Sequence, residues 1–178
     1  MPVMSALSSS VVQKTESMPR VYIGIGSNID REENIRGALE ELNAEFGPLI
    51  RSNVYETEAI GFEGDAFYNL VVGFDSERSV DELKAEFDRI EKRYGRTVES
   101  RRFAPRTLDL DLLLYGDLVD TTGTHDIPRK EIGEYAFVLL PLSEIAGDLK
   151  HPVTGERFAD MWSRFPKNQR LSKIKWSN

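Results

Sequence analysis

Apolar positions along the chain alternate between the two-residue period of strands and the 3.6-residue period of helices. Four segments have the pattern of strands: Val21 to Ile25, Leu49 to Thr57, Asn69 to Phe74 and Leu108 to Tyr115. Helical stripes lie between them, from Ile35 to Phe46 and from Val80 to Tyr94. A pair with capping-box spacing precedes each stripe, Asp30 with Glu33 and Ser79 with Glu82.

The resulting order of elements, β-α-β-β-α-β, is that of the ferredoxin-like α+β sandwich. An apolar stretch from Phe137 to Ile145 and a last helix containing Phe158 and Met161 add C-terminal elements, and we expect three layers, α/β/α. We expect one domain over residues 20–166, preceded by a disordered, serine-rich tail, residues 1–19. Residues 167–178 contain basic side chains and no acid, and we expect a solvated tail there.

Composition excludes several functional classes. The chain has 178 residues and no cysteine, which excludes disulfides and thiolate metal sites, and its two histidines are too few for a multi-histidine zinc site. A formal net charge of −7 is a poor electrostatic match for nucleic acid. No apolar run is long enough to span a bilayer, and the N-terminus lacks the features of a signal peptide, so we expect a cytoplasmic location.

The run Arg106-Thr107-Leu108-Asp109-Leu110-Asp111-Leu112 carries the clearest candidate chemistry. Because strand side chains alternate, Asp109 and Asp111 are predicted to share one face while the leucines point into the core. Two such carboxylates repel each other unless a cation lies between them, and oxygen ligands without nearby histidine or cysteine suit magnesium held with substrate phosphates. Taken alone, an Asp-x-Asp motif fits a half-solvated acidic strand better.

Arginines upstream of this run favour the functional interpretation. Arg96, Arg101, Arg102 and Arg106 lie in a segment with a single acid, Glu99. In an acidic protein, such a cluster beside two aspartates indicates a phosphate clamp next to a metal site, with a surface loop of ordinary ion pairs as the alternative. The two features together predict metal-assisted phosphoryl transfer from a nucleoside triphosphate.

A glycine-containing motif, Gly24-Ile25-Gly26-Ser27-Asn28, lies between the first strand and the first helix. No third glycine follows at the spacing of a dinucleotide fingerprint, and no Gly-Lys-Ser/Thr triplet is present, so the Rossmann and P-loop interpretations fail. A tight turn from strand to helix accounts better for these residues.

Short motifs in a matching order give the chain a resemblance to one enzyme family. They are Gly26-Ser27-Asn28, Tyr55-x-Thr57, Gly61, Phe67-x-Asn69, Gly95-Arg96, the run from Pro105 to Asp111, and Ala136-Phe137-Val138-Leu139-x-Pro141-Leu142. From about residue 20 to residue 165, the chain resembles the 6-hydroxymethyl-7,8-dihydropterin pyrophosphokinases of folate biosynthesis. The run from Pro105 to Asp111 is highly specific to that family, and the other motifs gain weight from their order.

This resemblance implies transfer of pyrophosphate from ATP to the pterin hydroxymethyl group, with release of AMP, by a monomer that uses neither nucleic acid nor a membrane. It implies that Asp109 and Asp111 bind two magnesium ions and that Arg96 and Arg106 complete the catalytic set. The implied pterin-binding residues are Thr57, Ile60, Phe67, Asn69, Phe103 and Phe137. The implied ATP-binding residues are Glu91, Arg96, Arg102, Arg106, Leu112 and Arg129.

Some of these positions have alternative interpretations. Phe137 precedes an apolar run and equally fits core packing, and Glu91 fits a solvent-facing helix position nearly as well. The chain departs from the family pattern at Phe103, Ala104, Val98, Arg129 and Tyr135, where the family has Trp, Gly, Arg, His and Arg. Two alternative functions are a pterin- or nucleotide-binding paralogue with weak or altered turnover, and RNA binding, which would require aromatic and basic residues on the sheet.

Overall fold

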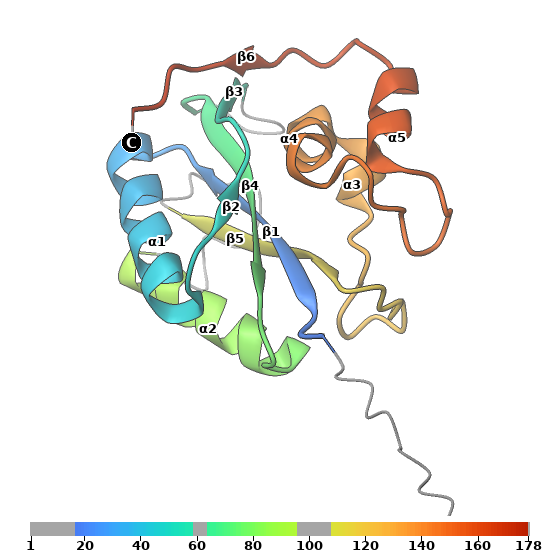
Figure 1. Cartoon of the computed structure of the whole chain (residues 1–178). Coiled ribbons are helices and arrows are strands. Elements are labelled where there is room, and N and C mark those ends of the chain that lie inside the picture. The colour runs from blue at the N-terminus through green and yellow to red at the C-terminus, as the bar shows by residue number, and fades with distance from the viewer. Residues whose placement is uncertain (1–16, 59–63, 96–107, 178) are drawn as a thin grey trace, which may run out of the picture.

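The computed structural model describes residues 17–58, 64–95 and 108–177 (Figure 1). Its strands are β1 (Arg20–Ser27), β2 (Ile50–Arg51), β3 (Tyr55–Thr57), β4 (Phe67–Asp75), β5 (Asp109–Tyr115) and β6 (Ser172–Lys173). Its helices are α1 (Arg31–Phe46), α2 (Val80–Arg93), α3 (Glu131–Glu134), α4 (Ala136–Ala146) and α5 (Phe158–Arg164). The described residues thus form an α+β fold with the expected order of principal elements.

The strands form one antiparallel sheet in the order β5-β1-β4-β3-β6, and β2 also pairs with β4. Helices α1 and α2 cover one face, and α3, α4 and α5 lie on the other (Figure 1). Apolar side chains fill both interfaces: Ile23, Leu70 and Leu112 belong to the α1/α2 cluster, whereas Val71 and Leu113 belong to the α4/α5 cluster. Helices therefore cover both faces of the sheet, as expected from the sequence for an arrangement of three layers, α/β/α.

The two predicted capping boxes have different outcomes. The Ser79 hydroxyl accepts a hydrogen bond from Glu82 N, and Glu82 Oε2 accepts one from Ser79 N, so the predicted box at α2 is confirmed. The predicted box at Asp30 is wrong, because Asp30 has a left-handed backbone (φ 43°) and makes no side-chain cap. A capping side chain requires an extended backbone at this position to reach the first helical amides.

The predicted strand from Leu49 to Thr57 is interrupted, which gives β2 and β3. Between them, the Ser52 hydroxyl accepts a hydrogen bond from Val71 N, and Ser52 N donates to Val71 O. The Ser52 side chain thus supplies part of the hydrogen bonding that backbone pairing would otherwise supply, and the regular strand is interrupted between β2 and β3.

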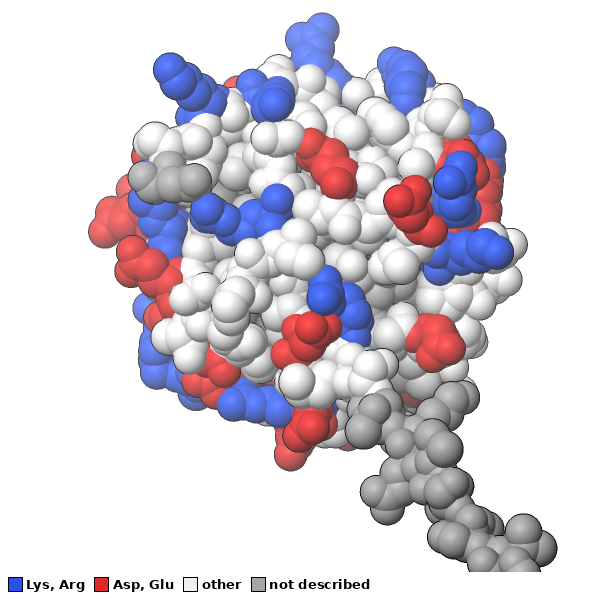
Figure 2. Space-filling model, viewed as in Figure 1, with Lys and Arg blue, Asp and Glu red and all other residues white. Residues whose placement is uncertain are grey.

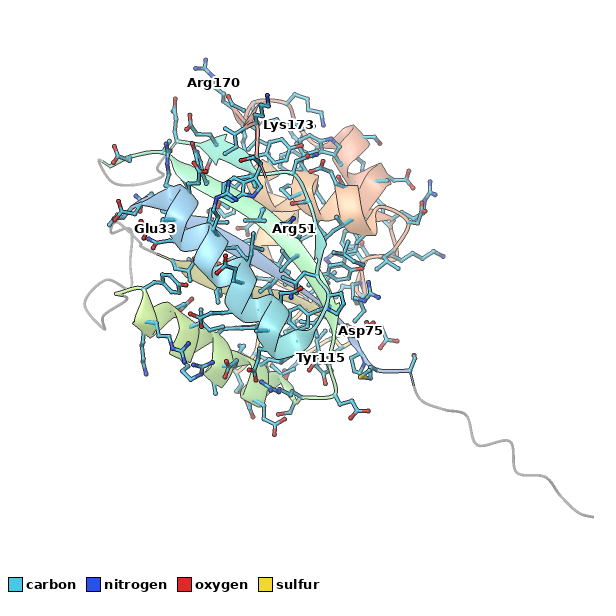
Figure 3. All side chains as sticks on the ribbon, turned by 60° about the vertical axis from the view of Figure 1, so that its left-hand side comes forward. Glu33, Arg51, Asp75, Tyr115, Arg170 and Lys173 are labelled. Atoms are coloured by element: carbon cyan, nitrogen blue, oxygen red, sulfur yellow. The ribbon has the colours of Figure 1, made fainter. Side chains whose placement is uncertain are left out.

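The C-terminal segment pairs with the edge of the sheet through its backbone, while its basic side chains are exposed, as expected of a solvated segment. Ser172–Lys173 pairs with Tyr55 and Glu56 of β3, and Ile174 N donates to Val54 O at 3.0 Å. Trp176 packs against the α1/α2 cluster and lies under the Arg36 guanidinium. In Figure 3, the labelled Arg170 and Lys173 lie at this edge of the sheet. The basic segment therefore covers the β3 edge.

Charged side chains of both signs are interspersed on the molecular face shown in Figure 2. Ion pairs between described residues include Arg20 with Asp75 and Arg157 with Asp160. No helix within the described ranges is long and apolar enough to cross a membrane.

Candidate active site

Four strands contribute to one row of paired residues across the sheet, which contains the predicted site residues Asp109 and Asn69. Gly26 of β1 pairs with Asp109 of β5 on one side and with Asn69 of β4 on the other, and Asn69 in turn pairs with Tyr55 of β3. Directly paired residues in an antiparallel sheet project from the same face. Asp109 and Asn69 therefore share the face on which α4 lies, with a glycine between them.

Both aspartates of β5 are paired with glycines of β1. Gly24 pairs with Asp111, just as Gly26 pairs with Asp109, so both aspartates have a neighbour without a side chain. A Cβ atom at Gly26 would lie only 2.9 Å from Asn69 Oδ1, closer than such contacts normally occur. The glycine at position 26 therefore lets the Asn69 amide lie over β1, where any larger residue would collide with it.

A side-chain hydrogen bond fixes the polar end of the row. Asn69 Nδ2 donates to Thr57 Oγ1 at 2.8 Å, and Thr57 is buried. Phe67, two residues before Asn69 on β4, pairs with Thr57 and is half-buried. The structure thus brings three of the predicted pterin-binding residues, Thr57, Phe67 and Asn69, together.

Phe137, another predicted pterin-binding residue, belongs to a different element. It lies in the first turn of α4, where its ring stacks on Tyr135 with 5.0 Å between the centroids and 18° between the planes. Both rings pack against the edge of the α4/α5 cluster and are only partly buried. Core packing, the alternative considered for Phe137, therefore accounts for part of its surface, and ring stacking against a pterin stays a prediction.

Asp109 and Asp111 repel each other at the acidic end of the row. Burial, followed by the negative charge of Asp109, raises the pKa of Asp111 well above its usual range, and Arg129 opposes this shift. Arg129 Nη2 lies 3.5 Å from Asp111 Oδ1 and Arg129 Nε lies 3.3 Å from Glu131 Oε2. A second cation close to the two aspartates would relieve the remaining repulsion.

The donor set suits a hard divalent cation that brings other ligands with it. Asp109 and Asp111 are carboxylates, and within the described ranges no group of three or more His, Cys, Asp or Glu side chains is placed to hold a metal. Magnesium commonly takes one or two protein carboxylates and completes its octahedron with water and phosphate oxygens. The residues present therefore fit magnesium that is bound together with a phosphate-bearing substrate.

Two predicted ATP-binding residues are largely enclosed in the protein. Glu91 on α2 is 2% exposed, and its Oε1 accepts a hydrogen bond from Leu110 N at 2.8 Å. The solvent-facing alternative for Glu91 is therefore wrong, and its carboxylate holds β5 between the two aspartates. The side chain of Leu112 lies in the α1/α2 cluster, so a contact with nucleotide would use its backbone.

Five predicted site residues lie outside the described residues, namely Ile60, Arg96, Arg102, Phe103 and Arg106. Conversely, sequence reasoning missed Glu131 as the second partner of Arg129. It also treated the glycines of β1 only as part of a turn, although alternation along the strand places Gly24 and Gly26 on one face. Their pairing with the two aspartates depends on the register between β1 and β5, which cannot be read from the sequence.

The α4 face of the sheet carries Asp109 and Asp111 beside the row that contains Gly26 and Asn69. This arrangement is suited to metal-assisted phosphoryl transfer. Comparison with known proteins identifies the group more closely. The sequence model of the family described as 7,8-dihydro-6-hydroxymethylpterin-pyrophosphokinase (HPPK) matches residues 22–147. The chain therefore belongs to this family, in which pyrophosphate is transferred from ATP to hydroxymethyldihydropterin in folate synthesis.

Individual relatives agree with this assignment. The chain is 37% identical to the 2-amino-4-hydroxy-6-hydroxymethyldihydropteridine pyrophosphokinase of Aquifex aeolicus, over 76% of this chain and 86% of that protein. It is 36% identical to the Bacillus subtilis protein of the same name, over 75% of this chain and 81% of the relative. It is also 34% identical to the folic acid synthesis protein fol1 of Pneumocystis carinii, over 90% of this chain but only 22% of that protein.

Solved structures support the fold. The wild-type HPPK-DHPS of Plasmodium falciparum aligns with a TM-score of 0.63 at 13% identity, over 83% of this chain and 45% of that chain. At this identity the similarity concerns the fold alone. The chain thus spans under half of this structural relative and about a fifth of the Pneumocystis protein.

Proposed function

We propose that this chain transfers pyrophosphate from ATP to 6-hydroxymethyl-7,8-dihydropterin and releases AMP, with its substrates held along the row from Asp109 to Asn69. The observation that carries the proposal is the pairing of Gly26 with both of these residues. Two strand spacings separate them, about 10 Å. A flat bicyclic ring above Gly26 would then have its polar edge at Asn69 and its hydroxymethyl group toward the aspartates.

Asn69 and Thr57 supply recognition at the pterin end. The Asn69 carboxamide carries donors and an acceptor, and its hydrogen bond to Thr57 fixes which way the amide faces. A pterin edge that presents both donors and acceptors matches such an amide. Phe67 and Phe137 would contact the ring faces, and Phe103 and Ile60 would complete the pocket.

Asp109 and Asp111 would hold two magnesium ions together with the triphosphate. The metal supplies charge neutralisation for phosphoryl oxygens and for the attacking hydroxyl. The carboxylates fix its position on a central strand, which Glu91 braces through Leu110 N. Arg96, Arg102, Arg106 and Arg129 would bind phosphate oxygens, with Glu91 and the backbone of Leu112 near the nucleotide.

Further features of the proposal concern the whole chain. The four strands β5-β1-β4-β3, with α1 and α2 on one face, support classification of the core as ferredoxin-like. Action as a monomer is also part of the proposal. Dependence on ATP agrees with a cytoplasmic location, and neither nucleic acid nor a membrane is proposed as a partner.

Gly26→Ala tests the proposed substrate position. The new Cβ would lie 2.9 Å from Asn69 Oδ1 and must displace that side chain. We expect pterin affinity to fall by about tenfold, roughly 1.4 kcal/mol, while affinity for an ATP analogue without pterin changes little. Gly133→Ala is the matched control, because a Cβ there meets nothing within 4 Å. Unchanged pterin affinity in a folded Gly26→Ala variant contradicts the proposed row.

A further inference from the structure

Arg129 occupies an unusual electrostatic position beside the two aspartates. Its backbone N donates to Leu113 O at 3.0 Å, which fixes the residue alongside β5. Ile127, two residues before Arg129, is completely buried and forms a bridge with Asp120. The backbone of the segment that carries Arg129 is therefore held in place at two residues. The guanidinium therefore extends from a fixed backbone toward the acidic end of the row.

Two carboxylates compete for this guanidinium. Arg129 Nη2 is 3.5 Å from Asp111 Oδ1, within ion-pair distance but longer than a good charge-assisted hydrogen bond. On the other side, Arg129 Nε is 3.3 Å from Glu131 Oε2, an atom that is buried and has no hydrogen bond to any described residue. Glu131 thus provides a second attachment for Arg129 if the contact with Asp111 is released.

The contact between Arg129 and Asp111 opposes binding of a metal ion by the two aspartates. Asp109 and Asp111 together attract a divalent cation, whereas Arg129 places a positive charge next to one of the same carboxylates. A divalent cation and the guanidinium repel each other, so binding of the metal alone must weaken or break the contact between Arg129 and Asp111. Phosphate oxygens change this balance, because they provide a new anionic partner for the guanidinium.

We propose that Arg129 is a releasable counter-ion of Asp111, which weakens metal binding in the absence of nucleotide and couples metal binding to arrival of the triphosphate. This inference rests on the proposed function, since it assumes that Asp109 and Asp111 hold the metal. It assigns Arg129 a positioning and coupling role, in addition to a phosphate contact. Glu131 retains the guanidinium near the site while Asp111 serves the metal.

The test measures binding of Mn²⁺, as a paramagnetic substitute for magnesium, to the full chain without nucleotide. Arg129→Met removes the charge and keeps a side chain of similar length, and we expect it to bind Mn²⁺ roughly tenfold more tightly than the unmodified chain. Arg129→Lys keeps the charge and should remain near the unmodified affinity. Equal affinity of the Arg129→Met variant and the unmodified chain overturns the proposal.

A second variant predicts a change of opposite sign. Glu131→Gln removes the competing carboxylate, leaves Arg129 to Asp111, and should weaken Mn²⁺ binding without nucleotide severalfold. Addition of a non-hydrolysable ATP analogue should strengthen Mn²⁺ binding much less in Arg129→Met than in the unmodified chain. A Glu131→Gln variant that binds Mn²⁺ more tightly, or an undiminished effect of the analogue in Arg129→Met, also overturns the proposal.

Asp109→Asn separates this inference from the proposed function. If Asp109→Asn binds Mn²⁺ as well as the unmodified chain with the ATP analogue present, the metal assignment itself is wrong. If Asp109→Asn loses Mn²⁺ while Arg129→Met behaves like the unmodified chain, the metal assignment stands and only the counter-ion role of Arg129 is wrong.

Discussion

Replacement of Asp109 by Asn should stabilise the metal-free protein. Residues two apart on a strand lie about 7 Å apart. Two unit charges at that separation repel by roughly 1–2.5 kcal/mol at an effective dielectric constant of about 20–40. Because the Asp111 side chain is 36% exposed and Arg129 partly neutralises it, we expect a gain in the free energy of unfolding of about 1 kcal/mol. For a domain of this size, that corresponds to roughly 2–4 °C in Tm.

The stability gained by Asp109→Asn should depend on pH, because the repulsion requires both carboxylates to be ionised. The folded-state pKa of Asp111 is raised, so ionisation of Asp111 costs stability as pH rises above the ordinary aspartate value of 3.8. The gain from Asp109→Asn should therefore be small near pH 4 and grow toward pH 8.

Chemical denaturation in the presence of EDTA measures the gain. Asp88→Asn, at an exposed position on α2, controls for the change in net charge. A loss of stability in Asp109→Asn at pH 8, or a gain equal to that of Asp88→Asn, refutes the repulsion between the two aspartates.

Three other predictions concern Asn69, His125 and Trp176. Asn69→Ala should weaken pterin binding by about 1–3 kcal/mol and leave ATP binding nearly unchanged, as calorimetry with each ligand will check. Hydrogen bonds to Asp120 and Asp81 raise the pKa of His125, so its stabilising effect is complete below its unfolded-state pKa and is lost as pH rises through the folded value. Denaturation at pH 5.5 and pH 9 should show a larger deficit for His125→Ala at pH 5.5, and a larger deficit at pH 9 would contradict this sign. Trp176→Ala should cost about 1–2 kcal/mol in urea denaturation because the ring packs on the core under Arg36; an unchanged midpoint would mean that the C-terminal segment is not held there.

Residue alternation made the acidic face of β5 predictable. Leu110 and Leu112 lie in the α1/α2 cluster and Asp109 and Asp111 project from the other face, as the two-residue period requires. The helices were predictable for a similar reason, because a stripe of apolar residues can be buried on only one side. Local patterns of this kind contain the information about which face each residue occupies.

Long-range pairing explains what the sequence did not reveal. The hydrogen bond from Asn69 to Thr57 depends on the register between β3 and β4, and strand β6 forms through backbone groups that leave no side-chain pattern. The ion pair between Arg129 and Glu131 joins residues on either side of Lys130, where spacing alone indicates no contact. Asp30 shows a local failure, because its residue type suits a cap while its backbone conformation prevents one.

The central claim is tested most directly by the products of the reaction. The full chain is incubated with ATP, magnesium chloride and 6-hydroxymethyl-7,8-dihydropterin, and the nucleotides and pterins are separated and quantified. We predict AMP and pyrophosphorylated pterin in equal amounts, with neither formed when EDTA replaces magnesium or when the pterin is omitted. Release of ADP in place of AMP, or a folded chain that forms no pyrophosphorylated pterin, would contradict the proposed transfer.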